Sequence, residues 1–166
     1  MAILRKKEKN KMTNEPVTII IPTYDNYQQL IECVNSMLFY RKIYPLKIII
    51  INNGRTEIKM DKKLNEWLTI VKPKINLGWE GGLKYGIEHS KSKYIVFAND
   101  DIYIPPSSSY WLKDMVSYMD SFPKIGAIGP ASNVVAEAQS IFHQPFSFRF
   151  ITNYLIEWQG ETSCLP

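Results

Sequence analysis

Two short apolar runs constrain the fold of this 166-residue chain most. Residues 17–21 (VTIII) and 46–51 (LKIIII) are rich in β-branched side chains and show little polar alternation. This pattern is typical of parallel strands that are covered on both faces. Residues 68–71, 94–98 and 125–128 are shorter runs of the same kind, and they predict three further strands.

Helical patterns separate the predicted strands. Residues 27–40 and 109–121 each place apolar side chains on one face at helical spacing. We also predict helices at 58–67 and 79–90, the latter beginning with a glycine-rich stretch. Strands that alternate with helices indicate an α/β fold with a mainly parallel sheet flanked by helices. The aromatic-rich residues 141–158 fit either strands or an irregular aromatic layer.

The distribution of charge bears on partners and location. The formal net charge is +4, and residues 1–14, with five basic residues and one acidic residue, account for all of it. The neutral remainder gives no sign of a nucleic-acid partner. We expect a disordered basic tail at 1–14 that is dispensable for folding, and one domain at 15–166. Without a signal peptide or an apolar run long enough to span a bilayer, we expect a cytoplasmic protein; the alternative is peripheral contact with the inner face of the membrane.

Polar residues follow three of the predicted strands. They are Pro22-Thr23-Tyr24-Asp25-Asn26, Asn52-Asn53-Gly54 and Asn99-Asp100-Asp101. Each cluster alone is compatible with a turn, but the carboxyl ends of parallel strands share one edge, where ligands bind. The ring of Tyr24 offers a flat face for a base. The adjacent carboxylates suit a hard cation such as Mg2+ or Mn2+, with substrate phosphates supplying further oxygen ligands.

The glycine-rich segment NLGWEGG at residues 76–82 has two readings. Its glycines could bring backbone close to an anionic ligand at a helix N-terminus, or they could permit close packing of a helix on the sheet. The chain lacks GxGxxG after the first predicted strand and lacks GxxxxGK[ST] throughout. Rossmann dinucleotide binding and P-loop chemistry therefore lose their best sequence support.

In order and spacing, these segments resemble the inverting glycosyltransferases of family 2, which have the GT-A fold. The resemblance runs from about residue 17 to 139, through VTIIIPTYDN, LKIIIINNG, INLGWEGG and KYIVFANDD. The segment IGAIGPASNVVAEAQ is similar to one in rhamnosyltransferase-like members. The resemblance implies metal-dependent, inverting transfer of a sugar from a UDP-, dTDP- or GDP-linked donor to a hydroxyl of a glycan or lipid-linked acceptor.

The resemblance also implies roles for single residues. The loop at 22–24 matches the base-binding loop, and Asn53 falls where the family often has a base-bonding aspartate. Residues 99–101 match the DXD motif, with Asn99 on the ribose side and Asp101 binding Mg2+ or Mn2+. The expected nucleotide-binding set is Pro22, Thr23, Tyr24, Asn53, Gly78, Asn99 and Asp100.

The chain also departs from the family pattern. Asn52 and Asn53 replace a common aspartate pair, and Lys84 replaces an asparagine and could reach a phosphate. The acceptor-binding half, which carries the catalytic base, has no match, so we expect a donor half truncated at its C-terminus, with weak turnover. Three late carboxylates are Glu137, Glu157 and Glu161. The alternatives are a non-catalytic nucleotide-sugar-binding or scaffold protein and, third, a nucleotidyltransferase, whose arginine-containing loop is missing.

Overall fold

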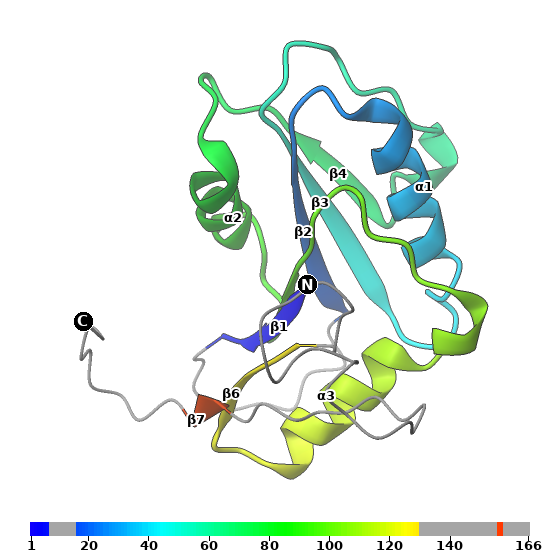
Figure 1. Ribbon diagram of the computed structural model, residues 1–166, viewed down its shortest axis with the longest axis vertical. Coiled ribbons are helices and arrows are strands. Elements are labelled where there is room, and N and C mark those ends of the chain that lie inside the picture. Colours follow the sequence, from blue (N-terminus) through cyan, green and yellow to red (C-terminus); the bar gives the residue numbers. More distant parts are fainter. Residues whose placement is uncertain (7–15, 130–155, 158–166) are drawn as a thin grey trace, which may run out of the picture.

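The computed structural model describes residues 1–6, 16–129 and 156–157. These residues form a sheet of seven strands in the order β4-β3-β2-β5-β1-β6-β7 (Figure 1). The strands are β1 (Ala2–Arg5), β2 (Val17–Thr23), β3 (Leu46–Asn52), β4 (Leu68–Val71), β5 (Tyr94–Phe97), β6 (Ile125–Ile128) and β7 (Ile156–Glu157). The neighbours from β4 to β5 are parallel, whereas β1 and β7 run antiparallel to the strands beside them. The predicted α/β fold with a mainly parallel sheet is therefore confirmed.

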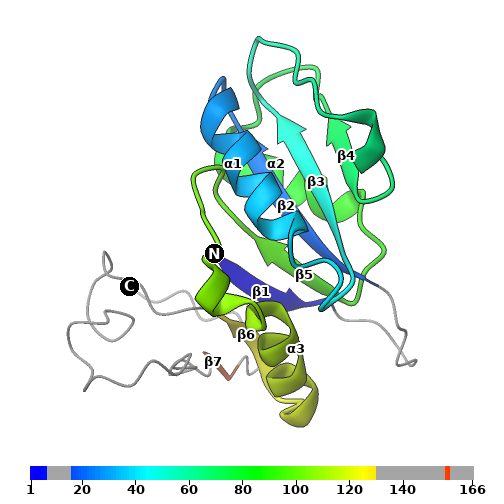
Figure 2. The same cartoon turned by 90° about the vertical axis from the view of Figure 1, so that its right-hand side faces the viewer.

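Helices cover both faces of the sheet. The helices are α1 (Tyr27–Leu38), α2 (Gly78–Glu88) and α3 (Trp111–Ser121), and two short 3-10 turns lie at Lys62–Leu64 and Pro106–Ser108. Figure 2 shows α1 in front of the sheet and α2 behind it. Successive side chains of β2 point to opposite faces of the sheet. Ile19 and Ile21 pack in the larger core with α1 and α3, and Ile20 packs in the smaller core under α2.

Glycines set the distance between α2 and the sheet. A Cβ on Gly86 would collide with Cγ2 of Ile20, and a Cβ on Gly82 would lie 3.0 Å from Cβ of Pro22. Both glycines are buried. Close helix–sheet packing therefore accounts for these two glycines, whereas Gly78 at the helix start is exposed and faces open space.

The N-terminal residues differ from the prediction of a disordered tail. Residues 2–5 form strand β1, which pairs with β5 on one side and β6 on the other. Ile3 has 0% exposure and belongs to the larger core. The prediction was wrong for these residues because the basic side chains that follow obscured a short apolar strand, AIL, at the start of the chain. Residues 7–15 lie outside the described residues.

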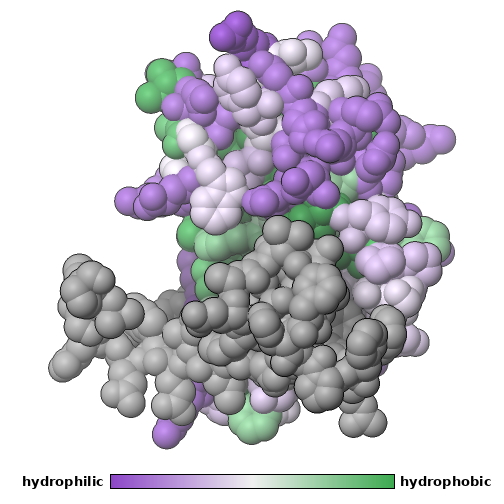
Figure 3. All heavy atoms as spheres, in the orientation of Figure 1, coloured by the Kyte–Doolittle hydropathy of each residue, from purple (hydrophilic) through white to green (hydrophobic). Residues whose placement is uncertain are grey.

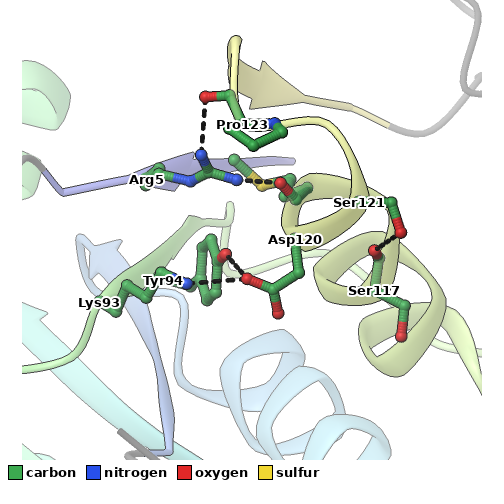
Figure 4. Close-up of polar contacts among 8 residues, drawn as sticks. Arg5, Lys93, Tyr94, Ser117, Asp120, Ser121 and Pro123 are labelled. Carbon is green, nitrogen blue, oxygen red and sulfur yellow. Dashed lines mark hydrogen bonds and ion pairs between the residues drawn. The ribbon is translucent and has the colours of Figure 1, made fainter. Parts of the chain in front are cut away.

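Polar contacts fasten β1 to α3 (Figure 4). The guanidinium of Arg5 donates to the backbone carbonyls of Pro123, at 2.8 Å, and Met119. Beside it, the carboxylate of Asp120 accepts from Nζ of Lys93 at 2.7 Å and from the hydroxyl of Tyr94. A cation at the end of a helix also complements the partial negative charge of its last carbonyls.

The helix expected at residues 58–67 is reduced to the single 3-10 turn Lys62–Leu64. Asp61 caps this turn by accepting from the backbone N–H of Lys63 at 2.9 Å. The carbonyl of Trp67 accepts from the N–H of Ile48 in β3 at 2.7 Å. The chain is therefore already part of the sheet at residue 67, and a helix cannot continue to that point. Of the aromatic segment 141–158, only β7 lies among the described residues.

Candidate functional site

The polar strand ends meet at one edge of the sheet. Thr23, the last residue of β2, is the register partner of Asn52, the last residue of β3. In Figure 2 the arrowheads of β3 and β4 point to the same end of the molecule. Figure 3 shows that hydrophilic residues dominate the visible surface at this end. This placement agrees with the rule that ligands of open α/β sheets bind beyond the carboxyl ends of the strands.

A short hydrogen bond joins the first and third polar clusters. Oγ1 of Thr23 donates to Oδ2 of Asp100 at 2.5 Å. The carbonyl of Thr23 also accepts from the backbone N–H of Asn53 at 3.0 Å. Thr23 therefore links all three strand ends, and it leaves the second carboxylate oxygen of Asp100 for another partner.

The side chain of Asp25 holds the loop after β3. Its Oδ1 accepts from the backbone N–H groups of Arg55 at 2.8 Å and Thr56 at 3.0 Å. These donors, Thr56 first, keep the pKa of the exposed Asp25 carboxyl below its usual value. Asp25 itself has a positive φ of 53°, and a Cβ on Gly54 would lie 2.7 Å from its backbone nitrogen, so the loop requires glycine there.

The amide of Asn53 holds the turn that precedes α2. Its Oδ1 accepts from the N–H of Leu77 at 3.1 Å, and its Nδ2 donates to the carbonyl of Gly78 at 2.8 Å. Gly78 has a φ of +67°, which L side chains rarely adopt. The expectation for Asn53 was a bond to the base; in the structure its buried amide bonds to backbone. The neighbouring Asn52 likewise bonds to backbone, at Gly54 and Thr56.

The motif loop after β5 rests on α1. Oγ of Ser36 accepts from the N–H of Ile104 at 3.1 Å. The thiol of Cys33 donates to the carbonyl of Asn99 at an Sγ–O distance of 3.5 Å. Burial raises the pKa of the Cys33 thiol to about 12, so Cys33 is a neutral packing residue at neutral pH. Helix α1 therefore fixes where Asn99, Asp100 and Asp101 emerge.

A small pocket opens between the loops after β2 and β3. Tyr24 lies in the chain between two of its lining residues, Thr23 and Asp25, and has 50% of its surface exposed. The pocket combines polar strand-end residues with an apolar floor from α1 and the loop after β3. Its lining residues are Thr23, Asp25, Asn26, Tyr27, Leu30, Asn52, Thr56 and Ile58.

The carboxylates of the motif suit a hard divalent cation only in part. Asp101 is exposed, and Asp100 keeps one oxygen that is not occupied by Thr23. The described residues bring no three His, Cys, Asp or Glu side chains together as a metal-binding group. Two carboxylates fit the chemistry of Mg2+ or Mn2+ when substrate phosphates and water complete the oxygen ligands.

Several functional candidates gain no further support from the described residues. Glu137 and Glu161 lie outside them, and the side chain of Glu157, in β7, is likewise not described. Lys84 is exposed on α2. Sequence reasoning assigned no role to Asp25 or Trp79; their hydrogen bonds join residues 20 to 31 positions apart, which sequence spacing does not reveal.

Among the described residues, no helix has the length and apolar character needed to cross a membrane. This finding leaves the prediction of peripheral membrane contact untested.

Comparison with known proteins gives a consistent result. The family model described as "Glycosyl transferase family 2" matches residues 18–163. A relative from Haemophilus influenzae, named an uncharacterized glycosyltransferase, is 28% identical over 135 residues, covering 77% of this chain and 40% of that protein. The chain thus spans about two fifths of the length of this relative.

Two solved structures share the fold. The crystal structure of S. aureus TarS has a TM-score of 0.52 and 19% identity, covering 64% of this chain and 20% of that one. The mannosyltransferase PcManGT from Pyrobaculum calidifontis, in complex with GDP-Man and Mn2+, has a TM-score of 0.54 and 20% identity, covering 66% of this chain and 33% of that one. The described sheet and helices therefore have the α/β architecture of GT-A glycosyltransferases.

Proposed function

The chain belongs to glycosyl transferase family 2, and from this premise we propose that its sheet edge binds the nucleotide-diphosphate part of a sugar donor. The observation that carries the proposal is the hydrogen bond between Thr23 and Asp100, which brings the base-side loop and the acidic motif to one place. The protein then transfers the sugar to an acceptor hydroxyl of a glycan or lipid-linked substrate, with inversion at the anomeric carbon.

We assign the base to the pocket between the loops after β2 and β3, with the ring of Tyr24 against its face. Pro22 and Gly82 bring the end of β2 and the helix α2 into close contact, and the amide of Asn53 donates to the carbonyl of Gly78 at the start of α2. In this proposal Asn53 shapes the site through backbone, and the residues that contact the nucleotide are Thr23, Tyr24, Asn99 and Asp100. A backbone N–H at the start of α2 is a further donor for phosphate.

Asp101, with the free oxygen of Asp100, is the proposed holder of Mg2+ or Mn2+. Such an ion, when bound, neutralises charge on the leaving diphosphate. The solved mannosyltransferase with GDP-Man and Mn2+ supports this assignment by analogy of fold. The base that accepts the proton of the acceptor hydroxyl stays unassigned, and family membership favours an enzyme over the scaffold alternative.

Titration calorimetry with UDP, GDP and dTDP, each with and without Mn2+, tests the proposal. We expect one of them to bind more tightly with Mn2+, and we expect Asp101→Asn to lose most of that metal-dependent gain. Asp114→Asn, at an exposed acid on α3, is the matched control and should bind like the wild type. Failure of all three nucleotides to bind, or equal metal dependence in Asp101→Asn, would contradict the proposed site.

A further inference from the structure

A side-chain hydrogen bond crosses the site between two elements. Nε1 of Trp79, in the first turn of α2, donates to Oδ1 of Asn99, two residues after the end of β5, at 3.0 Å. Both side chains are exposed, and Trp79 keeps 55% of its surface accessible. Among the described residues, this is the only side-chain hydrogen bond of Trp79, so it is the most specific contact of the indole.

The chemistry of the two groups fixes the orientation of the amide. An indole nitrogen only donates, whereas an asparagine amide carries an acceptor oxygen and a donor nitrogen. The oxygen of Asn99 must therefore face Trp79, and the nitrogen points elsewhere. Among the described residues, none accepts a hydrogen bond from Nδ2 of Asn99, so two N–H donors stay available at the sheet edge.

Trp79 is itself held in place by the turn before it. The amide of Asn53 bonds to the backbone on either side of this turn, at Leu77 and Gly78. Oδ1 of Asn76 accepts from the N–H of Gly78 at 2.8 Å. The position of the indole thus depends on the end of β3, and the orientation of Asn99 depends on the indole.

We propose that Trp79 is a positioning residue that locks the Asn99 amide with its nitrogen toward the bound nucleotide. This inference rests on the proposed function. It makes position 99 a hydrogen-bond donor to the ligand, whereas an aspartate there would present only acceptor oxygens. The ligand atom that faces Asn99 is then an oxygen acceptor, from either a ribose hydroxyl or a phosphate.

A double-mutant cycle tests whether Trp79 acts through Asn99. The dissociation constant is measured with Mn2+ for UDP or GDP, whichever binds the wild type more tightly. Asn99→Ala removes the donor, and we expect affinity to fall about five-fold. Trp79→Phe keeps an aromatic ring but lets the amide of Asn99 rotate. We expect the nucleotide affinity to fall by about two-fold or more, and by no more than it falls in Asn99→Ala. The double variant should bind like Asn99→Ala alone.

Asn99→Asp and deoxynucleotides distinguish the two sources of the oxygen. In the Asn99→Asp variant the indole can still donate to one carboxylate oxygen, so the other oxygen replaces the amide nitrogen. A ribose hydroxyl can donate to this oxygen, so affinity should stay near that of the wild type, and the effect of Asn99→Ala should vanish with 2′- or 3′-deoxy analogues. A phosphate oxygen cannot donate, so Asn99→Asp should then bind more weakly than Asn99→Ala.

The controls separate failure of this inference from failure of the proposed function. Thermal melting checks that each variant folds, and Phe39→Leu, at an exposed aromatic residue outside the site, should bind like the wild type. Absence of nucleotide binding by the wild type would contradict the proposed function. Binding by the wild type with no effect of Trp79→Phe, or with the same effect in the Asn99→Ala background, would overturn the role of Trp79 alone.

Discussion

Several polar side chains at the sheet edge bind backbone. Asp25 holds the N–H groups of Arg55 and Thr56, and Asn53 holds the turn at Leu77 and Gly78. The buried amide of Asn53 requires such partners, because a buried donor or acceptor that is left without one costs about 1–3 kcal/mol. The carboxylate of Asp25 is exposed, and its bonds hold the loop after β3. In the proposed site, the exposed side chains that we assign to the ligand are above all Tyr24, Asn99 and Asp101.

Tyr24 offers a direct test of base stacking. Replacement of Tyr24 by Ala should cost about 1–3 kcal/mol of nucleotide affinity, by analogy with stacking of bases on aromatic side chains. Tyr24→Phe should retain most of the affinity, because the ring face is unchanged. Calorimetry with the tightest-binding nucleoside diphosphate measures both. Equal large losses would assign the effect to the hydroxyl, and no loss in either would make Tyr24 a surface turn residue.

Ser36 tests whether α1 supports the motif loop. Ser36→Ala removes the acceptor of the buried N–H of Ile104, and we expect the free energy of unfolding to fall by about 1–3 kcal/mol. Ser121→Ala, which removes an exposed hydroxyl bond within α3, is the control and should change stability by no more than about 0.5 kcal/mol. Urea denaturation provides the comparison. Equal stability of the two variants would show that Ile104 finds another partner.

At the scale of single elements, β1 joins the parallel strands of the sheet, which end at β5, to β6 and β7. Four residues fill the space between β5 and β6, and without them these strands would each present an unpaired edge there. Arg5 then ties the strand to the C-terminal end of α3 (Figure 4). Part of the basic N-terminal segment is therefore structural.

Ile3→Ala measures the contribution of β1. Because Ile3 is fully buried, we expect a loss of about 2–5 kcal/mol in the free energy of unfolding. Ile75→Ala is the matched control, since Ile75 is 71% exposed, and it should be near neutral. Chemical denaturation of the full chain gives both values. If Ile3→Ala were as stable as Ile75→Ala, burial of the Ile3 side chain would contribute nothing measurable to the stability of the fold.

At the scale of the whole molecule, the Asp120 cluster couples stability to pH. Burial alone would raise the pKa of Asp120, but bonds from Lys93 and Tyr94 lower it overall. Burial opposes the charge on Lys93 as well, yet its bonds to Asp120 and Tyr94 raise its pKa. The pKa of Tyr94 is raised, first by burial and then by its bond to Asp120.

The signs predict loss of stability at both ends of the pH range. Asp120 contributes above the pKa of an unfolded aspartate, about 3.9, and this contribution disappears as pH falls through its lower folded value. Lys93 and Tyr94 contribute below about pH 10 and lose their contribution as pH rises through their raised folded values. The Asp120 and Lys93 side chains are 42% and 30% exposed, so solvent keeps the contribution of this ion pair within about 1 kcal/mol.

Asp120→Asn is the variant that checks this coupling. The asparagine keeps the size of the side chain but removes the charge, so stability should depend less on pH between about 5 and 2.5 than it does in the wild type. Asp114→Asn, at an exposed acid of the same helix without this cluster, should leave the acid limb unchanged. Urea midpoints across this range provide the measurement. If the stability of Asp120→Asn fell with acid as much as that of the wild type, Asp120 would not be a source of the pH dependence.

The amino-acid sequence by itself determined the alternating strands and helices, the polar strand ends and the family resemblance, because these depend on local periodicity and residue type. The β-branched runs at 17–21 and 46–51 became β2 and β3 almost at their predicted limits. The local pattern gave wrong predictions at two places. At residues 2–5, pairing with β5 and β6 produced a strand despite the basic side chains that follow. At residues 58–67, the hydrogen bond of Trp67 to β3 prevented a full helix despite the helical pattern.

Only the tertiary structure decided which polar side chains at the sheet edge are held by backbone and which stay accessible. Asn53 and Asn99 are the same residue type at the ends of two strands, yet one is enclosed by the turn before α2 and the other meets the indole of Trp79. Each amide is oriented by a partner 20 or more positions away, so the chain must close into the sheet before its donors and acceptors acquire a direction.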